Sequence, residues 1–264
     1  MSADATPAPA IELVGVIKRF GAAEVLRGVD LSVPAGEITV LLGPSGAGKT
    51  VTVSHIVGLI NPDRGIVRVE GENLARITDD RLNELRRGMA VVLQGTLPFT
   101  CGLFFSLNVY ENVAFGLRQR NRWSEARVHE STMSHLEMVG LRDRAESMPD
   151  ELSAGMCKRV AIARAMALEA RIVIVDDFDS GIDGVRLSLL CEMLADAQRE
   201  TGATFLVTTH SMSAARRLAD HVAVISDGTV VQAGPAAEVL DSDEPLVRQL
   251  ITGATSGPIT LRDV

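Results

Sequence analysis

The segment 43–50 reads Gly-Pro-Ser-Gly-Ala-Gly-Lys-Thr and lies between an apolar run at 38–42 and an amphipathic stretch at 51–60. A strand that ends in glycines lets successive main-chain N–H groups point at an anion, and the following helix adds the positive end of its dipole. In such a phosphate-binding loop (P-loop), the Lys49 ammonium reaches the β- and γ-phosphates and the Thr50 hydroxyl ligates Mg²⁺. The segment therefore predicts a site for a nucleoside triphosphate. The residues expected to contact the nucleotide are Gly43, Pro44, Ser45, Gly46, Ala47, Gly48, Lys49, Thr50 and Val51.

Composition limits the other possibilities. The chain has 264 residues, of which 46% are hydrophobic, which is enough for one sizeable core with an inserted subdomain. Its 26 basic and 34 acidic residues give a net charge of -8. A protein that binds a phosphate backbone needs clustered Lys and Arg, so no nucleic-acid partner is expected.

Neither a membrane span nor a disulfide framework is indicated. No apolar run reaches the ~18 residues that a membrane-spanning helix needs, and residues 1–10 lack a hydrophobic signal segment. The three cysteines are widely spaced and form no CxxC pair, so they are interpreted as reduced thiols. From these features we expect a soluble, cytoplasmic protein.

The hydrophobic pattern changes twice along the chain. Short β-rich runs with turn residues at 11–33 and 65–71 favour a small antiparallel sheet. Between about 107 and 141 the apolar residues recur every three to five positions, as in helices. Beyond 155, apolar runs alternate with helical segments, which predicts a parallel sheet covered on both faces. The predicted fold is α/β: a P-loop NTPase core with a parallel sheet, a small antiparallel β subdomain and an inserted helical subdomain.

Two further segments suit a nucleotide site. The apolar run 172–175 is followed by Asp176 and Asp177, and a buried strand that delivers a carboxylate at its end suits a Walker B aspartate that holds Mg²⁺. The alternative interpretation is an acidic turn after a strand without a ligand, and the presence of a P-loop upstream makes this interpretation weaker. Ser153 is placed to cap the helix that follows it; with the Gly155 amide it could also grip the γ-phosphate of ATP bound to a second molecule.

The order of the motifs resembles the ATP-binding cassette of an ABC transporter over about residues 11–235. The motifs that carry the resemblance are the P-loop, Gln94, Leu152-Ser153-Ala154-Gly155, Ile174-Val175-Asp176-Asp177, Ser180-Gly181-Ile182-Asp183 and Thr209-His210. The resemblance implies a head-to-tail dimer in which two ATP molecules lie between the P-loop of one subunit and the signature segment of the other. The signature residues expected to contact ATP in trans are Ser153, Ala154, Gly155 and Met156.

The same resemblance implies a role for several single residues. Phe20 would stack on adenine, Gln94 would touch Mg²⁺ and the attacking water, and Asp176 would support Mg²⁺. His210 would be the switch histidine near the γ-phosphate, and Asp183 would belong to the D-loop that communicates across the dimer. Together with Lys49 and Asp177, Gln94 and His210 form the expected catalytic set.

A narrower resemblance concerns the ATPases of Mce-type (mammalian cell entry) lipid transporters. Three features of this chain are similar to those proteins: Met156, the pair Lys158-Arg159, and the C-terminal segments 241–253 and 257–259. The resemblance implies lipid cargo, an integral-membrane permease, Mce-type substrate-binding proteins as partners, and a peripheral location on the cytoplasmic face of the cell membrane. The dimer could be a homodimer or a heterodimer.

The predicted domain boundaries follow from this resemblance and from the hydrophobic pattern of the sequence. We expect a flexible tail at 1–10, the ATP-binding domain at 11–240 with its helical subdomain at about 95–165, and a C-terminal extension at 241–264. The extension carries apolar residues between glycines and a proline, so it is not expected to form a core of its own. These apolar groups need a neighbour in their own cassette or in the partner, and we expect the extension to contribute to dimerisation.

Four residues depart from the pattern of the family. Asp177 stands where the family has a catalytic glutamate, so its carboxylate is one methylene, about 1.5 Å, further back. Ala154 replaces the first signature glycine, and Phe178 and Gly184 replace two prolines. These departures suggest slow hydrolysis, or a paralogue that works beside a more competent subunit.

Alternative functions follow from the same residues. Asp177 keeps open a regulatory cassette that binds ATP without hydrolysing it, and the cargo of an ABC importer need not be a lipid. A soluble ABC protein of translation or DNA repair is disfavoured, because those proteins carry two cassettes or a long coiled coil. Five aromatic residues follow Gln94 and either dock the permease or pack the helical lobe: Phe99, Phe104, Phe105, Tyr110 and Phe115.

Overall fold

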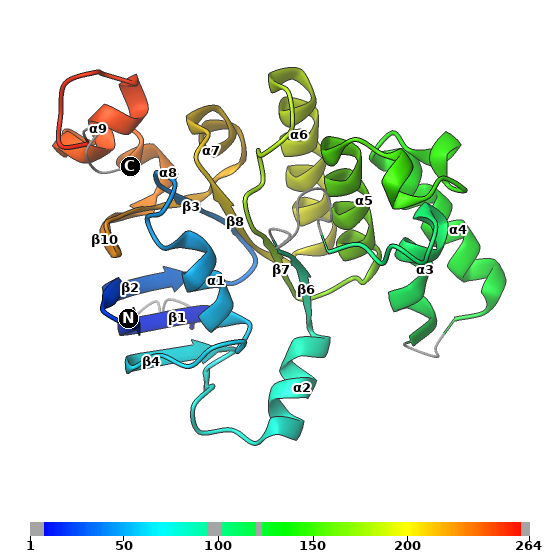
Figure 1. Ribbon diagram of the computed structural model, residues 1–264, viewed down its shortest axis with the longest axis horizontal. Helices are drawn as coiled ribbons and strands as arrows, with labels where there is room; N and C mark the ends of the chain where they lie inside the picture. The colour runs from blue at the N-terminus through cyan, green and yellow to red at the C-terminus, as the bar shows by residue number, and fades with distance from the viewer. Residues whose placement is uncertain (1–7, 94–101, 120–122, 260–264) are drawn as a thin grey trace, which may run out of the picture.

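The computed structural model of the chain describes residues 8–93, 102–119 and 123–259 (Figure 1). Gln94, Phe99 and most of the predicted N-terminal tail lie outside these residues, so the predictions made for them stay predictions. The described chain forms two sheets, with helices packed around the larger one.

The smaller sheet is antiparallel and has the strand order β2-β1-β4-β5. Its strands are β1 (Ile11–Phe20), β2 (Ala23–Val33), β4 (Arg64–Val69) and β5 (Glu72–Asn73). Buried and exposed side chains alternate along much of β2, because one face of this sheet covers the core and the other meets solvent. The predicted antiparallel sheet is therefore confirmed.

The larger sheet has six strands in the order β10-β9-β3-β8-β7-β6. The strands are β3 (Ile38–Leu42), β6 (Met89–Val92), β7 (Ile172–Val175), β8 (Thr204–Thr209), β9 (His221–Ser226) and β10 (Thr229–Pro235). The pairs from β9 to β6 are parallel, and β10 adds an antiparallel edge. Every residue of β3, β7 and β8 is buried, which is typical of parallel strands covered on both faces.

The two faces of the larger sheet belong to different parts of the core. Leu41, Ile174 and Ile225 pack into one apolar cluster with β1, β2 and the first helix. Val40 and Val175 point into a second cluster, which is built with the helices of the later chain. Successive residues of a strand point to opposite faces, so a continuous apolar run serves both clusters.

Helices cover both faces of this sheet (Figure 1). Their bounds are α1 (Lys49–Ile56), α2 (Asp79–Arg87), α3 (Val109–Gln119), α4 (Glu125–Met138), α5 (Ala154–Ala167), α6 (Gly184–Thr201), α7 (Met212–Leu218), α8 (Ala236–Val239) and α9 (Pro245–Thr252). Short 3₁₀ turns occupy Arg142–Arg144 and Pro149–Glu151. Helices α3, α4 and α5 pack against one another on one side of the molecule. None of the helices in the described ranges combines the length and the apolar character needed to cross a membrane.

The described part of the C-terminal extension packs on its own chain. Val247 of α9 is fully buried, and α9 contacts β10. The side-chain amide of Gln249 accepts a hydrogen bond from the Ile259 N–H (2.7 Å) and donates to the Ile259 carbonyl (2.9 Å), which ties the chain after α9 back onto the helix. The extension therefore buries apolar surface without a partner.

Candidate nucleotide-binding site

The P-loop connects the end of β3 to the start of α1, as its sequence predicts. Gly46 and Gly48 have φ angles of 80° and 104°, in the left-handed region that glycine tolerates. A Cβ on Gly43 would lie 2.1 Å from the carbonyl oxygen of Ile225, and one on Gly48 would lie 2.6 Å from the Leu26 side chain. The loop thus needs glycine both for its turn and for its close packing between β2 and β9.

Lys49 lies at the first turn of α1 and bends back over the loop. Its ammonium group donates to the carbonyls of Gly43 (2.7 Å) and Pro44 (2.8 Å). Burial lowers the pKa of Lys49, and the charges of nearby carboxylates, Asp177 first, partly oppose this shift. Lys49 lines a cavity of about 360 Å³ whose wall also includes Thr50, Asp176 and Asp177. The structure therefore brings the P-loop and the two aspartates that follow β7 to one cavity.

Asp176 is fully buried at the end of β7. Its Oδ1 accepts a hydrogen bond from the Thr208 hydroxyl (2.6 Å), whereas its Oδ2 is buried without a hydrogen-bond partner among the described residues. A buried carboxylate oxygen without a partner is costly, and a cation relieves this cost. Asp176 and the Thr50 hydroxyl are oxygen donors of the kind that Mg²⁺ takes, so these residues fit the expected metal.

Asp177 is half-buried in the same cavity. Its main-chain N–H donates to the Thr208 hydroxyl (2.8 Å), so Thr208 of the neighbouring strand β8 holds both aspartates. Asp177 has a φ of 55°, an uncommon conformation for a residue other than glycine, and functional sites are enriched in such residues. Lys158 of α5 donates to the Asp177 carbonyl, and this contact was not foreseen from the sequence.

His210 directly follows β8 and faces the turn after β7. Its Nε2 lies 3.0 Å from Oδ2 of Asp179, a residue outside the motifs that carry the family resemblance. Asp177, Asp179 and His210 offer ligand atoms that all lie within 4.8 Å of one another. The signal that could have found Asp179 is the acidic spacing Asp177-x-Asp179 directly after an apolar strand, together with a histidine at the end of another strand.

The signature segment lies in a different place. Ser153 caps α5, with its hydroxyl accepting from the Met156 N–H (3.3 Å), as the sequence predicts. A Cβ on Gly155 would lie 2.7 Å from the Gly181 carbonyl, so the signature and the D-loop are in close contact. Ser153, Gly155 and Met156 line a cavity of about 140 Å³ together with Asp183, and no residue of the P-loop lines it.

The remaining predicted residues take structural positions of their own. Asp183 caps α6 by accepting from the Arg186 N–H (3.0 Å), a hydrogen bond that lowers the pKa of its carboxyl. Phe178 is fully buried, although it stands where the family has a proline. Phe20 ends β1 with 49% of its surface exposed, and the Lys18 ammonium lies 5.6 Å from its ring centre. An exposed ring is free to stack, but Phe20 is not among the residues that line the P-loop cavity.

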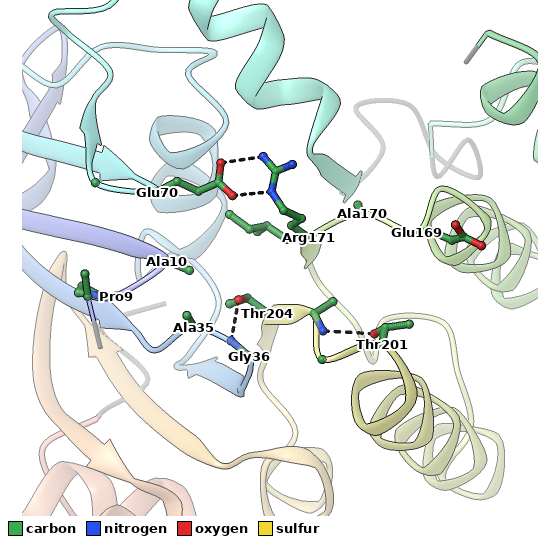
Figure 2. Close-up of a pocket in the computed structure, with 15 residues that line it drawn as sticks. Pro9, Ala10, Ala35, Gly36, Glu70, Glu169, Ala170, Arg171, Thr201 and Thr204 are labelled. Carbon is green, nitrogen blue, oxygen red and sulfur yellow. Dashed lines mark hydrogen bonds and ion pairs between the residues drawn. The ribbon is translucent and has the colours of Figure 1, made fainter. Parts of the chain in front are cut away.

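A larger cavity, of about 740 Å³, opens at the opposite end of the parallel strands (Figure 2). Two pairs of its polar groups bind each other: Glu70 with Arg171 (2.7 Å), and the Gly36 N–H with the Thr204 hydroxyl (2.9 Å). Ligands of parallel sheets bind at the carboxyl ends of the strands, and this cavity lies at the amino ends of β7 and β8. The smaller cavity at the P-loop is therefore the candidate nucleotide site.

The fold and this cavity define the class: a P-loop ATP-binding subunit in which a glycine-rich loop and a strand-end aspartate face each other. Residues 26–180 match the ABC transporter family. Because this match spans more than half of the chain, the protein belongs to the ABC transporter family. It is an ATP-binding subunit of an ABC transporter, a class of ATPase that dimerises and works with a membrane permease.

Individual relatives and solved structures agree with this assignment. The chain is 37% identical over 254 residues to "Probable ribonucleotide transport ATP-binding protein mkl" of Mycobacterium leprae (strain TN), covering 96% of this chain and 72% of the relative. It is 35% identical over 238 residues to "Intermembrane phospholipid transport system ATP-binding protein MlaF" of Escherichia coli (strain K12), covering 90% and 87%. The structure resembles "Dimeric Structure of MJ0796, a Bacterial ABC Transporter Cassette", with a TM-score of 0.77, 29% identity, and coverage of 86% of this chain and 98% of that one.

Proposed function

We propose that this chain hydrolyses ATP to power the transport of lipid through a partner permease, with Mce-type substrate-binding proteins as further partners. The observation that supports lipid as the cargo is the similarity to the phospholipid transport ATPase of E. coli, which spans 90% of this chain and 87% of the relative. The chain would act as a peripheral subunit on the cytoplasmic face of the membrane, because ATP is supplied there.

A nucleotide cargo is the second candidate. The M. leprae relative, described as a ribonucleotide transport protein, is slightly more identical, but the match leaves over a quarter of that relative uncovered. The cassette itself does not discriminate between the two cargoes, because its P-loop cavity would bind ATP, whereas the permease would select the cargo. We favour lipid because the similarity to the phospholipid system extends over most of both chains.

Within the site, the main-chain N–H groups of residues 45–50 of the P-loop would cradle the phosphates, and the Lys49 ammonium would move from the loop carbonyls to the β- and γ-phosphate oxygens. Thr50, Asp176 and Gln94 would hold Mg²⁺, which when bound neutralises charge on the phosphate oxygens. The orphaned Oδ2 of Asp176 supports this assignment. Phe20 would stack on adenine.

Hydrolysis would use the carboxylate of Asp177 to orient the attacking water and accept its proton, with His210 beside the γ-phosphate. Asp177 lines the cavity with Lys49, which supports this role. Its side chain is one methylene shorter than that of glutamate, and its main chain is fixed by Thr208. We therefore propose slow turnover, and a regulatory cassette that binds ATP without hydrolysing it is the alternative.

The separation of the two cavities supports a shared site between two subunits. Ser153, Gly155 and Met156 line a cavity that contains no P-loop residue, so in one subunit they would be away from the ATP held by the P-loop. In a head-to-tail dimer, Ser153, Ala154, Gly155 and Met156 would contact the γ-phosphate of the partner's ATP, with Asp183 at the junction. The partner could be a second copy or a related subunit.

The test is reconstitution of the chain with its permease and Mce-type protein in proteoliposomes. ATP-dependent transfer of a fluorescent phospholipid is expected, and Lys49→Ala should abolish it. Parallel vesicles receive a radiolabelled ribonucleotide in place of the lipid. Nucleotide uptake without lipid transfer would replace the proposed cargo, and ATP binding without phosphate release would favour the regulatory cassette.

A further inference from the structure

Asp179 and His210 meet at the carboxyl edge of the larger sheet. Asp179 lies in the turn after β7, and His210 directly follows β8, the parallel neighbour of β7. The Nε2 atom of His210 lies 3.0 Å from Oδ2 of Asp179. The ligand atoms of Asp179 and His210 lie within 4.8 Å of that of Asp177, which lines the P-loop cavity, so this pair lies close to the P-loop. Asp179 belongs to none of the motifs that carry the family resemblance.

The carboxylate of Asp179 is the fixed member of the pair. Its side chain is only 5% exposed, whereas the ring of His210 is 55% exposed. Its Oδ1 accepts hydrogen bonds from the Thr209 hydroxyl (2.5 Å) and from the His210 N–H (3.4 Å). The Thr209 hydroxyl in turn accepts from the Ser211 N–H (2.9 Å) at the start of α7. These contacts aim Oδ2 at the exposed imidazole.

This geometry fixes which ring nitrogen carries the hydrogen. An ionised carboxylate only accepts hydrogen bonds, so the nitrogen that faces it, Nε2, must donate. In the neutral ring Nδ1 is then unprotonated and is the nitrogen left for the nucleotide side. We propose that Asp179 is a positioning residue that sets the tautomer and orientation of His210 for ATP hydrolysis. This inference rests on the proposed role of His210 beside the γ-phosphate.

Asp179→Asn separates this role from a structural one. The amide oxygen of asparagine can replace Oδ1, where the Thr209 hydroxyl and the His210 N–H donate. Its NH₂ group then replaces Oδ2 and donates to His210 Nε2, which must become the acceptor. The substitution keeps the size of the side chain and the buried hydrogen bonds while it reverses the tautomer.

The first readout is the ¹⁵N spectrum of the imidazoles in the full chain, with His210 assigned from its loss in His210→Gln. We expect a pyrrole-type Nε2 in the wild type and a pyridine-type Nε2 in Asp179→Asn. The second readout is steady-state phosphate release. Asp179→Asn should lower kcat about tenfold or more and leave KM for ATP within about twofold, because the change affects the orientation of His210, whereas the hydrogen bonds that position Lys49 do not involve Asp179.

Asp220→Asn is the matched control. Asp220 accepts a hydrogen bond from the Ile38 N–H (2.9 Å) at the other end of β3, far from the phosphate loop. The Asp220→Asn variant is expected to shift the melting temperature without changing kcat or the His210 spectrum. If Asp179 acted only on stability, Asp179→Asn would resemble this control.

A double-mutant comparison distinguishes failure of the inference from failure of the proposed function. If Asp179 acts through His210, Asp179→Asn adds no further loss of kcat to His210→Ala. Full activity of His210→Ala would reject the proposed role of His210 itself. The inference would be overturned if His210→Ala lowered kcat but Asp179→Asn had a normal kcat or an unchanged His210 tautomer. That result would leave the proposed function standing.

Discussion

The ammonium group of Lys158 donates a hydrogen bond to the main-chain carbonyl of Asp177, and its nitrogen lies 4.0 Å from the Oδ2 atom of the Asp177 carboxylate. Lys158 belongs to α5, the helix that begins at the signature segment. The contact therefore links the proposed catalytic carboxylate to the signature helix of the same chain. The reach of the Asp177 side chain is limited both by its length and by this attachment.

Restoring the missing methylene should raise turnover. We expect Asp177→Glu to increase phosphate release, with a ceiling set by the roughly 10²–10⁴-fold contribution of a positioned general base. Asp177→Asn should remove most of the remaining activity and favour an ATP-trapped dimer, because binding is retained while the base is lost. Steady-state phosphate release and size-exclusion chromatography with ATP measure both effects.

A matched control exists for the change at Asp177. Asp227 also has a positive φ, 47°, and is exposed in the turn between β9 and β10. Asp227→Glu introduces the same residue into the same kind of backbone conformation and should leave the rate unchanged. Equal rates for the wild type, Asp177→Glu and Asp177→Asn would reject the catalytic role of Asp177 and favour the regulatory cassette.

Removing the P-loop cation should abolish tight ATP binding or turnover. Lys49 already donates to two loop carbonyls, so its ammonium is positioned at the proposed phosphate site, and charge-assisted hydrogen bonds are the strong ones. Isothermal titration calorimetry with ATP compares Lys49→Ala with Arg199→Ala, which removes an exposed cation from α6. Near-normal ATPase activity in Lys49→Ala would contradict the assignment of the site.

The exposed phenylalanines at the start of the helical lobe should couple the cassette to its permease. Phe104 and Phe105 are 44% and 46% exposed, and the main chain of Phe104 is held by hydrogen bonds to the Asn112 side chain. Their rings can therefore be removed without emptying the core. We expect alanine at both positions to uncouple ATPase activity from transport in the reconstituted complex.

Val185 and Leu189, which are 74% and 60% exposed on α6, provide a control of the same kind. Alanine at these two positions removes exposed apolar surface elsewhere and should leave coupling intact. The alternative is that these rings only pack the helical subdomain. It would be favoured if the variant with alanine at Phe104 and Phe105 unfolded while its soluble fraction still assembled normally with the permease.

Truncation before Asp241 should weaken self-association, as measured by sedimentation equilibrium. The structure adds a second expected effect, because Val247 is fully buried against its own chain. Val247→Ala should reduce the free energy of unfolding by about 2 kcal/mol while leaving the dimer dissociation constant unchanged. An unchanged dissociation constant after truncation would show that the extension acts only within its own chain.

His55 should make the protein less stable in acid. It is 1% exposed, its Nδ1 lies 2.7 Å from the Val51 carbonyl, and burial lowers the pKa of its imidazole below 6.5. Below pH 6.5 the unfolded chain therefore binds more protons at this position than the folded chain, and stability falls as the pH falls. Between pH 7.5 and 5.5 the wild type should lose up to about 1 kcal/mol more than His55→Leu in urea unfolding. Equal losses would show that His55 does not titrate differently in the two states.

The sequence predicted the elements whose signals are local. The P-loop is defined by eight consecutive residues, and β7 occupies the apolar run at 172–175 that was predicted as a buried strand. Ser153 caps α5 as predicted, because an N-cap depends on a side chain and an amide three residues apart. The strand β6 (Met89–Val92) was not foreseen, since four apolar residues carry too little periodicity to identify an element.

The tertiary structure decided which distant residues meet. Asp179 and His210 are 31 residues apart, and Lys158 and Asp177 are 19 apart, so no local pattern relates the members of either pair. The first pair forms because β7 and β8 are parallel neighbours whose carboxyl ends share one edge, and the second because α5 packs against the turn after β7. The sequence alone thus determined the phosphate loop and the family, whereas strand order and helix packing determined how the carboxylates and the histidine are held.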